Sequence, residues 1–287
     1  MGAVVLLDEL SPADLERLAT VLRERSGLAF GEARWPFLRN RAREAMVRAG
    51  FVSIRRWLEE VVASAERRGA LYCDLEEALQ VHETSFFRYE EHYRALRDHV
   101  LPALVRPGGP RVRICSVGCS TGEEAYSIAM AVRESGLRGV AGAVDIVGLD
   151  VSRQALSLAV AGTYPASRIA SVPHDYRARY FLSTGDRFTV VPALRQMIRF
   201  RHHDVRRGFY IGKFDVIVCC NVLLYFTPAV KQQILNQLAD SLTEGGYLFV
   251  GHAEGVTPSA SSFVTRGLPA PFMHQRLGRH PAAITLA

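Results

Sequence analysis

The spacing of hydrophobic residues divides the chain into a helical first part and a mixed second part. From Pro12 onward, apolar side chains recur at intervals of three and four, as at Leu15, Leu18 and Leu22. This pattern predicts a helix that begins at Ser11-Pro12, followed by helices over residues 35–49, 53–66 and about 74–80. Since no alternating strand pattern occurs there, residues 1–80 are expected to form a small all-helical domain.

The pattern changes after the turn sequence Pro107-Gly108-Gly109-Pro110. Short apolar runs predict strands over 111–117, 145–149, 214–219 and 247–251, and helical patterns between them predict helices over 123–134, 152–161 and 228–242. Strands that alternate with helices favour an α/β fold, a doubly wound and mostly parallel sheet, over residues 111–287. Residues 81–110 are expected to connect the two domains and to contact the ligand, and residues about 181–203 are expected to form a short antiparallel insertion.

Composition excludes a mainly disordered chain and leaves the partner open. The 287 residues are 48% hydrophobic and 22% charged, with a net charge of +6. Lys213 and Lys231 are the lysines, so the rest of the 35 basic residues are arginines. A basic excess is compatible with nucleic acid, a membrane surface or an acidic protein as partner. Coding bias toward arginine explains the excess equally simply, and we favour that interpretation.

The apolar segments and the cysteines of the chain bear on its location in the cell. Its start reaches Asp8 and Glu9 too early for a secretory signal. The longest apolar stretch, 216–226, is interrupted by Asn221 and is short for a membrane helix, so no membrane insertion is expected. The five cysteines form no C-x-x-C pair, which predicts reduced, buried thiols and no metal site. We therefore expect a cytoplasmic protein, whose oligomeric state the sequence leaves open.

A glycine turn and two polar residues indicate the ligand. Gly118 and Gly122 lie where the first predicted strand meets its helix, with the spacing G-x-x-x-G rather than that of dinucleotide binders. Asp150 ends the second strand and is suited to accept hydrogen bonds from ribose hydroxyls, although capping of the next helix is an alternative role. Asn221 ends the third strand. A ribose acid without a pyrophosphate loop favours S-adenosylmethionine over NAD, and hence a class I methyltransferase.

Four segments of the chain resemble the chemotaxis receptor methyltransferase family, CheR. They cover roughly residues 80–275 in the order and spacing of that family; the first 80 residues agree only in being helical. The segments are Glu83-Thr84-Ser85-Phe86-Phe87-Arg88 with Glu91-His92-Tyr93, Ser120-Thr121-Gly122-Glu123-Glu124-Ala125-Tyr126-Ser127-Ile128-Ala129, Asn221-Val222-Leu223-Leu224-Tyr225-Phe226, and Gly251-His252-Ala253-Glu254.

The resemblance implies methyl transfer from S-adenosylmethionine to glutamate side chains on the cytoplasmic helices of a chemoreceptor. It implies that Tyr225 lines the substrate side and acts in catalysis as a hydrogen-bond donor, for which packing is the alternative. It also implies a set of cofactor-binding residues at the methionine, ribose and adenine ends. These are His82, Thr84, Arg88, Glu123, Asp150, Asp204, Val205, Cys220 and Asn221.

Departures from the family pattern leave other functions open. His82 stands where the family prefers Asn, and Cys220 stands where it usually has Arg. A signalling module that binds cofactor or receptor without catalysis is therefore one alternative. Methylation of another target such as RNA is a second, although no nucleic acid is expected because Asn221 is not followed by prolines. The short segment 181–189 favours a member that does not dock on a receptor's C-terminal tail.

Overall fold

Contacts between residues divide the chain into two units. The computed structural model describes residues 9–209, 211–254, 263–265 and 270–277. The first unit joins the N-terminal residues up to Val81 with Tyr225–Lys231, and the second unit joins His82–Leu224 with the residues from Gln232 onward. Each unit is described by itself.

Helices make up the first unit. They are α1 (Pro12–Ser26), the 3₁₀ turn η1 (Glu32–Arg34), α2 (Trp35–Arg48), α3 (Ile54–Ala65) and α4 (Ala70–Ala78). The Ser11 hydroxyl accepts from the backbone N–H of Asp14, whose carboxylate accepts from the N–H of Ser11, so a capping box begins α1. Helix α4 starts at Ala70, ahead of the predicted 74, because the buried side chain of Tyr72 adds a core contact to the first turn.

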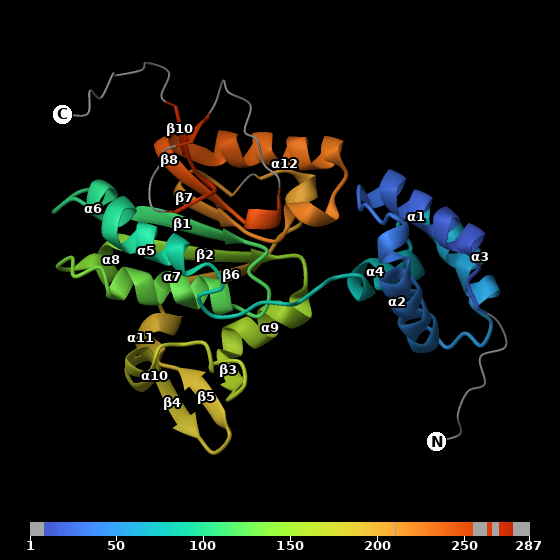
Figure 1. Ribbon diagram of the computed structural model, residues 1–287, viewed down its shortest axis with the longest axis horizontal. Coiled ribbons are helices and arrows are strands. Elements are labelled where there is room, and N and C mark those ends of the chain that lie inside the picture. Colours follow the sequence, from blue (N-terminus) through green and yellow to red (C-terminus); the bar gives the residue numbers. More distant parts are fainter. Residues whose placement is uncertain (1–8, 210, 255–262, 266–269, 278–287) are drawn as a thin grey trace. The chain divides into compact units, whose positions relative to one another are not determined.

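A seven-stranded sheet organises the second unit (Figure 1), in the order β6-β2-β1-β7-β8-β10-β9. Strands β6, β2, β1, β7 and β8 are parallel to their neighbours, whereas β10 is antiparallel to both β8 and β9. The sheet strands are β1 (Val112–Val117), β2 (Val144–Asp150), β6 (Ile198–His202), β7 (Phe214–Cys219), β8 (Leu242–Val250), β9 (Phe263–Thr265) and β10 (Met273–Arg276). The predicted doubly wound, mostly parallel fold is confirmed.

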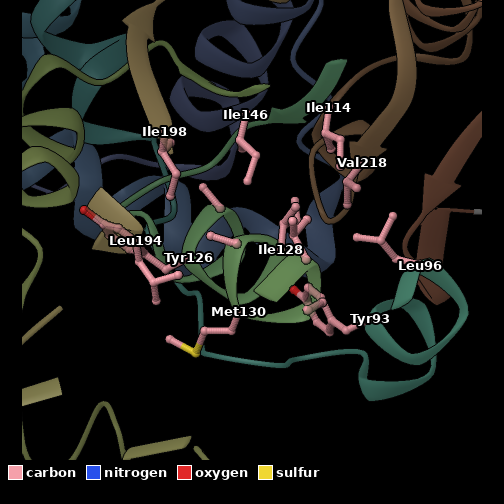
Figure 2. Close-up of a cluster of buried hydrophobic side chains, with 14 of the residues drawn as sticks. Tyr93, Leu96, Ile114, Tyr126, Ile128, Met130, Ile146, Leu194, Ile198 and Val218 are labelled. Atoms are coloured by element: carbon pink, nitrogen blue, oxygen red, sulfur yellow. The ribbon is translucent and has the colours of Figure 1, made fainter. Parts of the chain in front are cut away.

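Helices cover the sheet on opposite sides, with α7 and α12 on different faces in Figure 1. Figure 2 shows the core beside α7, where Ile128 faces Ile114, Ile146 and Val218 of the sheet and Met130 lies on the other side of the helix. The strand residues that alternate with them, such as Cys115, Val147 and Ile217, are buried as well, and burial on both faces explains the continuous apolar runs of the central strands. The helical segments of this unit are α5 (Glu90–Ala95), the π-helical turn η2 (Leu96–Val100), α6 (Leu101–Leu104), α7 (Glu123–Arg133), α8 (Val140–Ala143), α9 (Arg153–Ala161), α10 (His174–Tyr180), α11 (Pro192–Arg195), the 3₁₀ turns η3 (Val205–Arg207), η4 (Leu223–Tyr225) and η5 (His252–Glu254), and most of α12 (Pro228–Ser241).

The antiparallel insertion begins earlier in the chain and ends sooner than the predicted 181–203. It is a three-stranded sheet in the order β3-β5-β4, formed by β3 (Thr163–Pro165), β4 (Phe181–Thr184) and β5 (Arg187–Val190). Strand β6 within the predicted range instead pairs parallel to β2 in the large sheet. Short Phe, Val and Ile runs around Pro192 suggested an antiparallel insertion, whereas β6 is an edge strand of the large sheet with exposed arginines.

Two further expectations concern surface and location. Four of the five cysteines are buried, as predicted, but Cys73 on α4 is exposed, because it lies on the opposite side of that helix from Tyr72 and Leu75. In the part of the chain that the structure describes, every helix falls short of the length and apolar character needed to cross a bilayer.

Candidate functional site

The site begins where the chain order of the sheet reverses, between β1 and β7. The chain leaves β1 toward β2 on one side and leaves β7 toward β8 on the other, so the turns that follow β1 and β7 face a shared crevice. We call residues 118–122 the glycine turn and residues 220–223 the asparagine turn. A Cβ atom on Gly118 would lie 2.3 Å from Cγ2 of Val222, so the two turns are in direct contact.

Left-handed backbone shapes the glycine turn. Gly118 and Gly122 have φ values of 71° and 97°, and a Cβ on Gly122 would lie 2.9 Å from the Cβ of Ala159 on α9. Ser120 is also left-handed, with φ of 49°, and its N–H donates to the Asp150 carboxylate at 2.8 Å. The turn is therefore fastened to the end of β2.

Asp150 is buried at the end of β2 with its carboxylate facing the glycine turn. Its second oxygen accepts from the N–H of Ser152 at 2.8 Å, whereas the hydroxyl of Ser152 caps α9. Burial raises the pKa of Asp150, although its backbone hydrogen bonds and the electrostatic effect of His82 lower it in part. The residue that caps α9 is thus Ser152 and not Asp150, which was the alternative role expected for Asp150. The carboxylate of Asp150 therefore keeps lone pairs that can accept from hydroxyl donors.

The glycine turn also holds a buried polar atom that fits a ligand. The Ser120 hydroxyl is buried and has no hydrogen-bond partner among the described residues. A buried hydroxyl normally finds a partner. Together with the Asp150 carboxylate, it fits a ligand that carries adjacent hydroxyl groups, as the ribose of S-adenosylmethionine does.

The segment before α5 brings His82, Thr84 and Arg88 to the same side of the unit. His82 lies within electrostatic range of Asp150, and the Thr84 carbonyl accepts from the guanidinium of Arg168 at 2.8 Å. Arg88 is exposed and donates to the carbonyl of Glu83 at 3.0 Å. Phe87 before it has φ of 54°, a value that is costly for a bulky residue. Its N–H donates to the Ser127 hydroxyl of α7 at 3.0 Å, which ties the segment to that helix.

The two glutamates at the start of α7 point to different surroundings. Glu123 accepts from the Thr121 hydroxyl at 2.6 Å and pairs with Arg168 at 3.3 Å. Glu124 accepts from the Ser116 hydroxyl at 2.7 Å. Consecutive helical residues point about 100° apart, so the two glutamates have different neighbours.

Electrostatics single out Glu124, which the sequence analysis did not select. Burial raises its pKa to about 7, and the charge of Glu254 adds to the rise while Arg88 opposes it. Glu124 therefore lies among the groups of the crevice, whereas Glu123 faces Arg168. A Glu-Glu pair in the sequence contains no signal that tells the two apart.

Asp204 and Val205 follow the edge strand β6. The N–H of His203 donates to the Asp150 carbonyl at 2.9 Å, so this loop lies beside the end of β2. Although burial raises the pKa of Asp204, its hydrogen bond to Arg206 at 2.8 Å and the positive charge of that residue leave the pKa lowered. Val205 is buried. The side chain of Asp204 is thus satisfied within its own loop, and Val205 offers an apolar surface.

Cys220 and Asn221 form the start of the asparagine turn. Asn221 has φ of 61°, and its side-chain oxygen accepts from the Tyr89 hydroxyl at 2.9 Å. The buried sulfur of Cys220 lies 3.8 Å from Nδ1 of His92. Burial raises the pKa of the Cys220 thiol, and burial lowers the pKa of His92 to about 4. Both groups are therefore neutral at pH 7, so a Cys–His pair replaces the charge that the family usually places at position 220.

A cluster with metal-ligand chemistry lies next to this turn, contrary to the expectation of no such grouping. Glu91, His92 and His252 bring one potential ligand atom each within 4.8 Å of one another. Spacing could not reveal it, because His252 lies far along the chain. Oε1 of Glu91 and Nε2 of His252 are 2.7 Å apart, and Nε2 of His92 lies 3.2 Å from the Pro271 carbonyl. These contacts already occupy the groups that a metal would need.

Tyr225 groups with the first unit rather than with the cofactor residues. Its carbonyl accepts from the N–H of Ala29 at 2.8 Å, and a β-bridge joins Leu28 to Phe226. The guanidinium of Arg34 lies 5.0 Å from the centre of the Tyr225 ring, a cation–π geometry. These contacts join residues nearly two hundred positions apart, so no local sequence pattern indicates them.

Comparison with known proteins gives one consistent result. The family model "CheR methyltransferase, SAM binding domain" matches residues 82–270. The chain is 37% identical over 62% of its length to the chemotaxis protein methyltransferase of Listeria monocytogenes, of which it covers 67%. It is 33% identical over 85% of its length to chemotaxis protein methyltransferase 1 of Pseudomonas aeruginosa, of which it covers 90%. It is 30% identical over 92% of its length to the chemotaxis protein methyltransferase of Vibrio parahaemolyticus, of which it covers 95%.

The matches to the Pseudomonas aeruginosa and Vibrio parahaemolyticus relatives span both units of the chain. The matched family model begins at His82, where the second unit begins. The resemblance inferred from the sequence is confirmed, and with it the cofactor, S-adenosylmethionine, and the reaction class, methyl transfer. The chain belongs to the CheR methyltransferase family.

Proposed function

We propose that this methyltransferase esterifies glutamate side chains on the cytoplasmic helices of a chemoreceptor. The relatives named above are chemotaxis protein methyltransferases. The observation that carries the proposal is the crevice between β1 and β7, where the glycine turn contacts the asparagine turn and Asp150 lies at the next strand end. The proposal places the enzyme in the cytoplasm, where such receptor helices are accessible.

The proposed cofactor site uses the side chains around this crevice. Asp150 and Ser120 would hold the ribose, with His82 beside them, and Asp204-Val205 would border the adenine. Arg88 would pair with the carboxylate of the methionine end, with Thr84 nearby, and the asparagine turn with Cys220 and Asn221 would close the site. For the amino group we assign Glu124 in place of Glu123, because Glu124 faces Ser116 and the charge of Arg88 while Glu123 is engaged with Thr121 and Arg168.

The chemistry requires little from the protein beyond placement. A glutamate side chain has an ordinary pKa of about 4.3, so the acceptor is already an anionic nucleophile at pH 7. The cofactor, when bound, supplies an activated methyl group together with its leaving group. The chain must align the acceptor and remove water from it without protonating it. No general base is needed for this step.

Tyr225 is our proposed hydrogen-bond donor to the acceptor carboxylate. A phenol can donate to a carboxylate and hold its position, which assists desolvation without proton transfer. The guanidinium of Arg34 over its ring supports this role, because a cation on the ring face draws electron density from the phenol and strengthens its O–H as a donor. Arg34 also places a positive charge in the first unit, whereas position 220 contributes none.

We further propose that the enzyme acts without a tether to the receptor's C-terminal tail. Strands β4 and β5 are joined by a tight turn at Gly185, which leaves the small sheet with short strands. An extended peptide that pairs with a strand edge gains affinity from each main-chain hydrogen bond, so a short edge offers little of it.

Transfer of a radiolabelled methyl group tests the proposal directly. Purified enzyme, labelled S-adenosylmethionine and a receptor cytoplasmic fragment should give base-labile label on the fragment, with equal rates when its C-terminal tail is deleted. Glutamine in place of the acceptor glutamates should abolish the label. Label on RNA, or tight binding of S-adenosylhomocysteine with no label on any receptor, would overturn the proposal in favour of another target or a binding role.

A further inference from the structure

We propose that Glu254 is a positioning residue that holds the asparagine turn in place against the glycine turn. This inference rests on the proposed cofactor site, since it concerns how that site is kept in shape. Glu254 lies in η5, which follows β8, and its residue is fully buried. It is one of the few carboxylates with no exposed surface in the described part of the chain.

The carboxylate of Glu254 binds backbone from two segments. One oxygen accepts from the N–H of Val222 at 2.7 Å and from the N–H of Leu223 at 3.0 Å. The other accepts from the N–H of Gly251 at 3.2 Å. An ionised carboxylate has acceptor capacity on both oxygens, whereas an amide offers one oxygen and would direct its own N–H₂ toward a donor. The arrangement therefore needs an acid at position 254.

The asparagine turn needs such support because its backbone is unusual. Asn221 is left-handed although it is not glycine, and the chain leaves the ladder of β7 at this point. The N–H groups of the following residues then have no strand partner, and a buried N–H without an acceptor is costly. Glu254 supplies that acceptor from the neighbouring strand end.

The position of the asparagine turn is important because this turn contacts two other segments of the proposed cofactor site. Val222 lies over Gly118, where a Cβ would come within 2.3 Å of its methyl group. Asn221 accepts from Tyr89 of the segment that carries Arg88. Gly251 completes the fit, because a Cβ there would lie 3.2 Å from the N of Asn221 and 3.3 Å from the Tyr89 hydroxyl. A shift of the turn would therefore move both walls of the site.

The charge of Glu254 also acts on Glu124, whose pKa it helps to raise. This influence gives a readout that a merely structural role would leave unchanged. The positive charge of Arg88 lowers the pKa of Glu124 and so acts in the opposite direction to Glu254. The hydroxyl of Ser116 also donates a hydrogen bond to Glu124. The other titratable groups that sense Glu124 are Tyr93, Cys115, Cys119, Cys219 and Cys220, which burial keeps neutral at pH 7.

The test compares Glu254→Gln with Glu244→Gln, which alters an exposed glutamate of β8. We expect Glu254→Gln to lower kcat by about a hundredfold, the size of a roughly 1 Å misplacement, with a smaller change in KM for the receptor fragment. The pH midpoint of S-adenosylhomocysteine binding should fall as the pKa of Glu124 falls, and Glu254→Asp should recover part of both. Wild-type kcat and an unchanged pH midpoint in a folded Glu254→Gln protein would overturn the inference.

Hydrogen exchange decides the matter if Glu254→Gln does not fold. In the wild-type enzyme, the amides of Val222 and Leu223 should exchange slowly although they lie in a turn. Exchange at the rate of an exposed amide would overturn the inference. Failure of the proposed site is a separate result, because Asp150→Asn and Asn221→Ala would then leave cofactor binding intact while the Glu254 contacts persist.

Discussion

Two turns meet beside the ends of β1 and β7, and they are built in different ways. The glycine turn after β1 reaches two of its three left-handed conformations through Gly118 and Gly122, and the third, at Ser120, is held by Asp150. The asparagine turn after β7 reaches one at Asn221 without any glycine and is held by side chains of other elements, Glu254 and Tyr89. The first turn thus depends mainly on its own glycines, whereas the second depends on side chains that are distant in the chain. A turn of the first kind can be recognised in a sequence, whereas the second kind is recognisable only in the fold.

The largest effect is expected where the turns touch. Gly118→Ala adds a Cβ that would lie 2.3 Å from Val222 and forces alanine into a left-handed conformation. We expect a loss of about 2–4 kcal/mol in the free energy of unfolding, through steric overlap and backbone strain together, and no measurable binding of S-adenosylhomocysteine. Thermal denaturation and calorimetric titration measure the two effects.

Gly136→Ala is the matched control. Gly136 has φ of 70°, close to that of Gly118, but a Cβ there would meet no atom within 4 Å. Its loss of stability should be about 1 kcal/mol, from backbone strain alone, with cofactor affinity unchanged. Equal behaviour of the two variants would show that the contact between the turns has no importance.

The second effect concerns the anchor of the glycine turn. Asp150→Asn replaces a carboxylate that accepts from the N–H groups of Ser120 and Ser152 by an amide that cannot accept from both. A hydrogen bond to a charged group contributes about 1.5–3 kcal/mol, so we expect a loss of about tenfold to a hundredfold in affinity for S-adenosylhomocysteine. Calorimetric titration measures it, and Asp145→Asn at the other end of β2 serves as control. Unchanged affinity would remove Asp150 from the proposed site.

The third effect is a pH dependence that comes from Glu124. Because burial raises its pKa to about 7, the unliganded protein should lose stability as pH rises from about 4.5 through about 7, where the folded state must release that proton. A cationic ligand favours the ionised carboxylate, so S-adenosylmethionine should bind more tightly as pH rises from about 6 to 8 and should release a proton near pH 7.

Titration calorimetry in buffers of different ionisation enthalpy measures this proton directly. Glu124→Gln should abolish the release, whereas Glu123→Gln should retain it, because Glu123 is engaged with Thr121 and Arg168. Retained release in Glu124→Gln would return the amino-group role to Glu123.

The smallest effect is expected in the first unit, at the ring of Tyr225. Arg34→Ala removes a cation–π contact worth about 0.5–1 kcal/mol, so we expect a few-fold decrease in kcat with cofactor affinity unchanged. Arg41→Ala is the control, because Arg41 lies over Phe37 and pairs with Glu44. If both variants lower kcat equally, general basicity of the first unit matters, and the contact with Tyr225 does not.

Much of the fold could be predicted because the central strands and helices have simple periodic patterns. The strand β7 and the start of α7 at Glu123 match the predicted bounds, since glycine or charged residues border each of them. Strand β6 pairs with β2 in the large sheet, although the short apolar runs around Pro192 indicated an antiparallel insertion, because a short edge strand gives no pattern that distinguishes the two. Helices α5 and α6 with the π-helical turn between them were not predicted, because segments of six and four residues are too short for a clear helical period.

The candidate site was predicted in outline and not in its contacts. His82, Thr84, Arg88, Asp150 and Asn221 were selected, and the roles proposed for them remain predictions. Glu124, Ser120 and Glu254 were missed as functional candidates. The choice between Glu123 and Glu124 depends on which side of one helical turn faces the crevice, and the role of Glu254 depends on contacts with N–H groups about thirty residues earlier.

The central strands and helices, the two glycines of the first turn and the family could be inferred from the sequence, because backbone freedom and hydrophobic period are properties of neighbouring residues. Which groups share an environment depends on the fold. It brought Glu254 to Val222, Tyr89 to Asn221 and Arg34 to Tyr225, and it set the pKa of Glu124 near 7. Burial and hydrogen-bond partners are properties of packing, and packing joins residues that the chain keeps far apart.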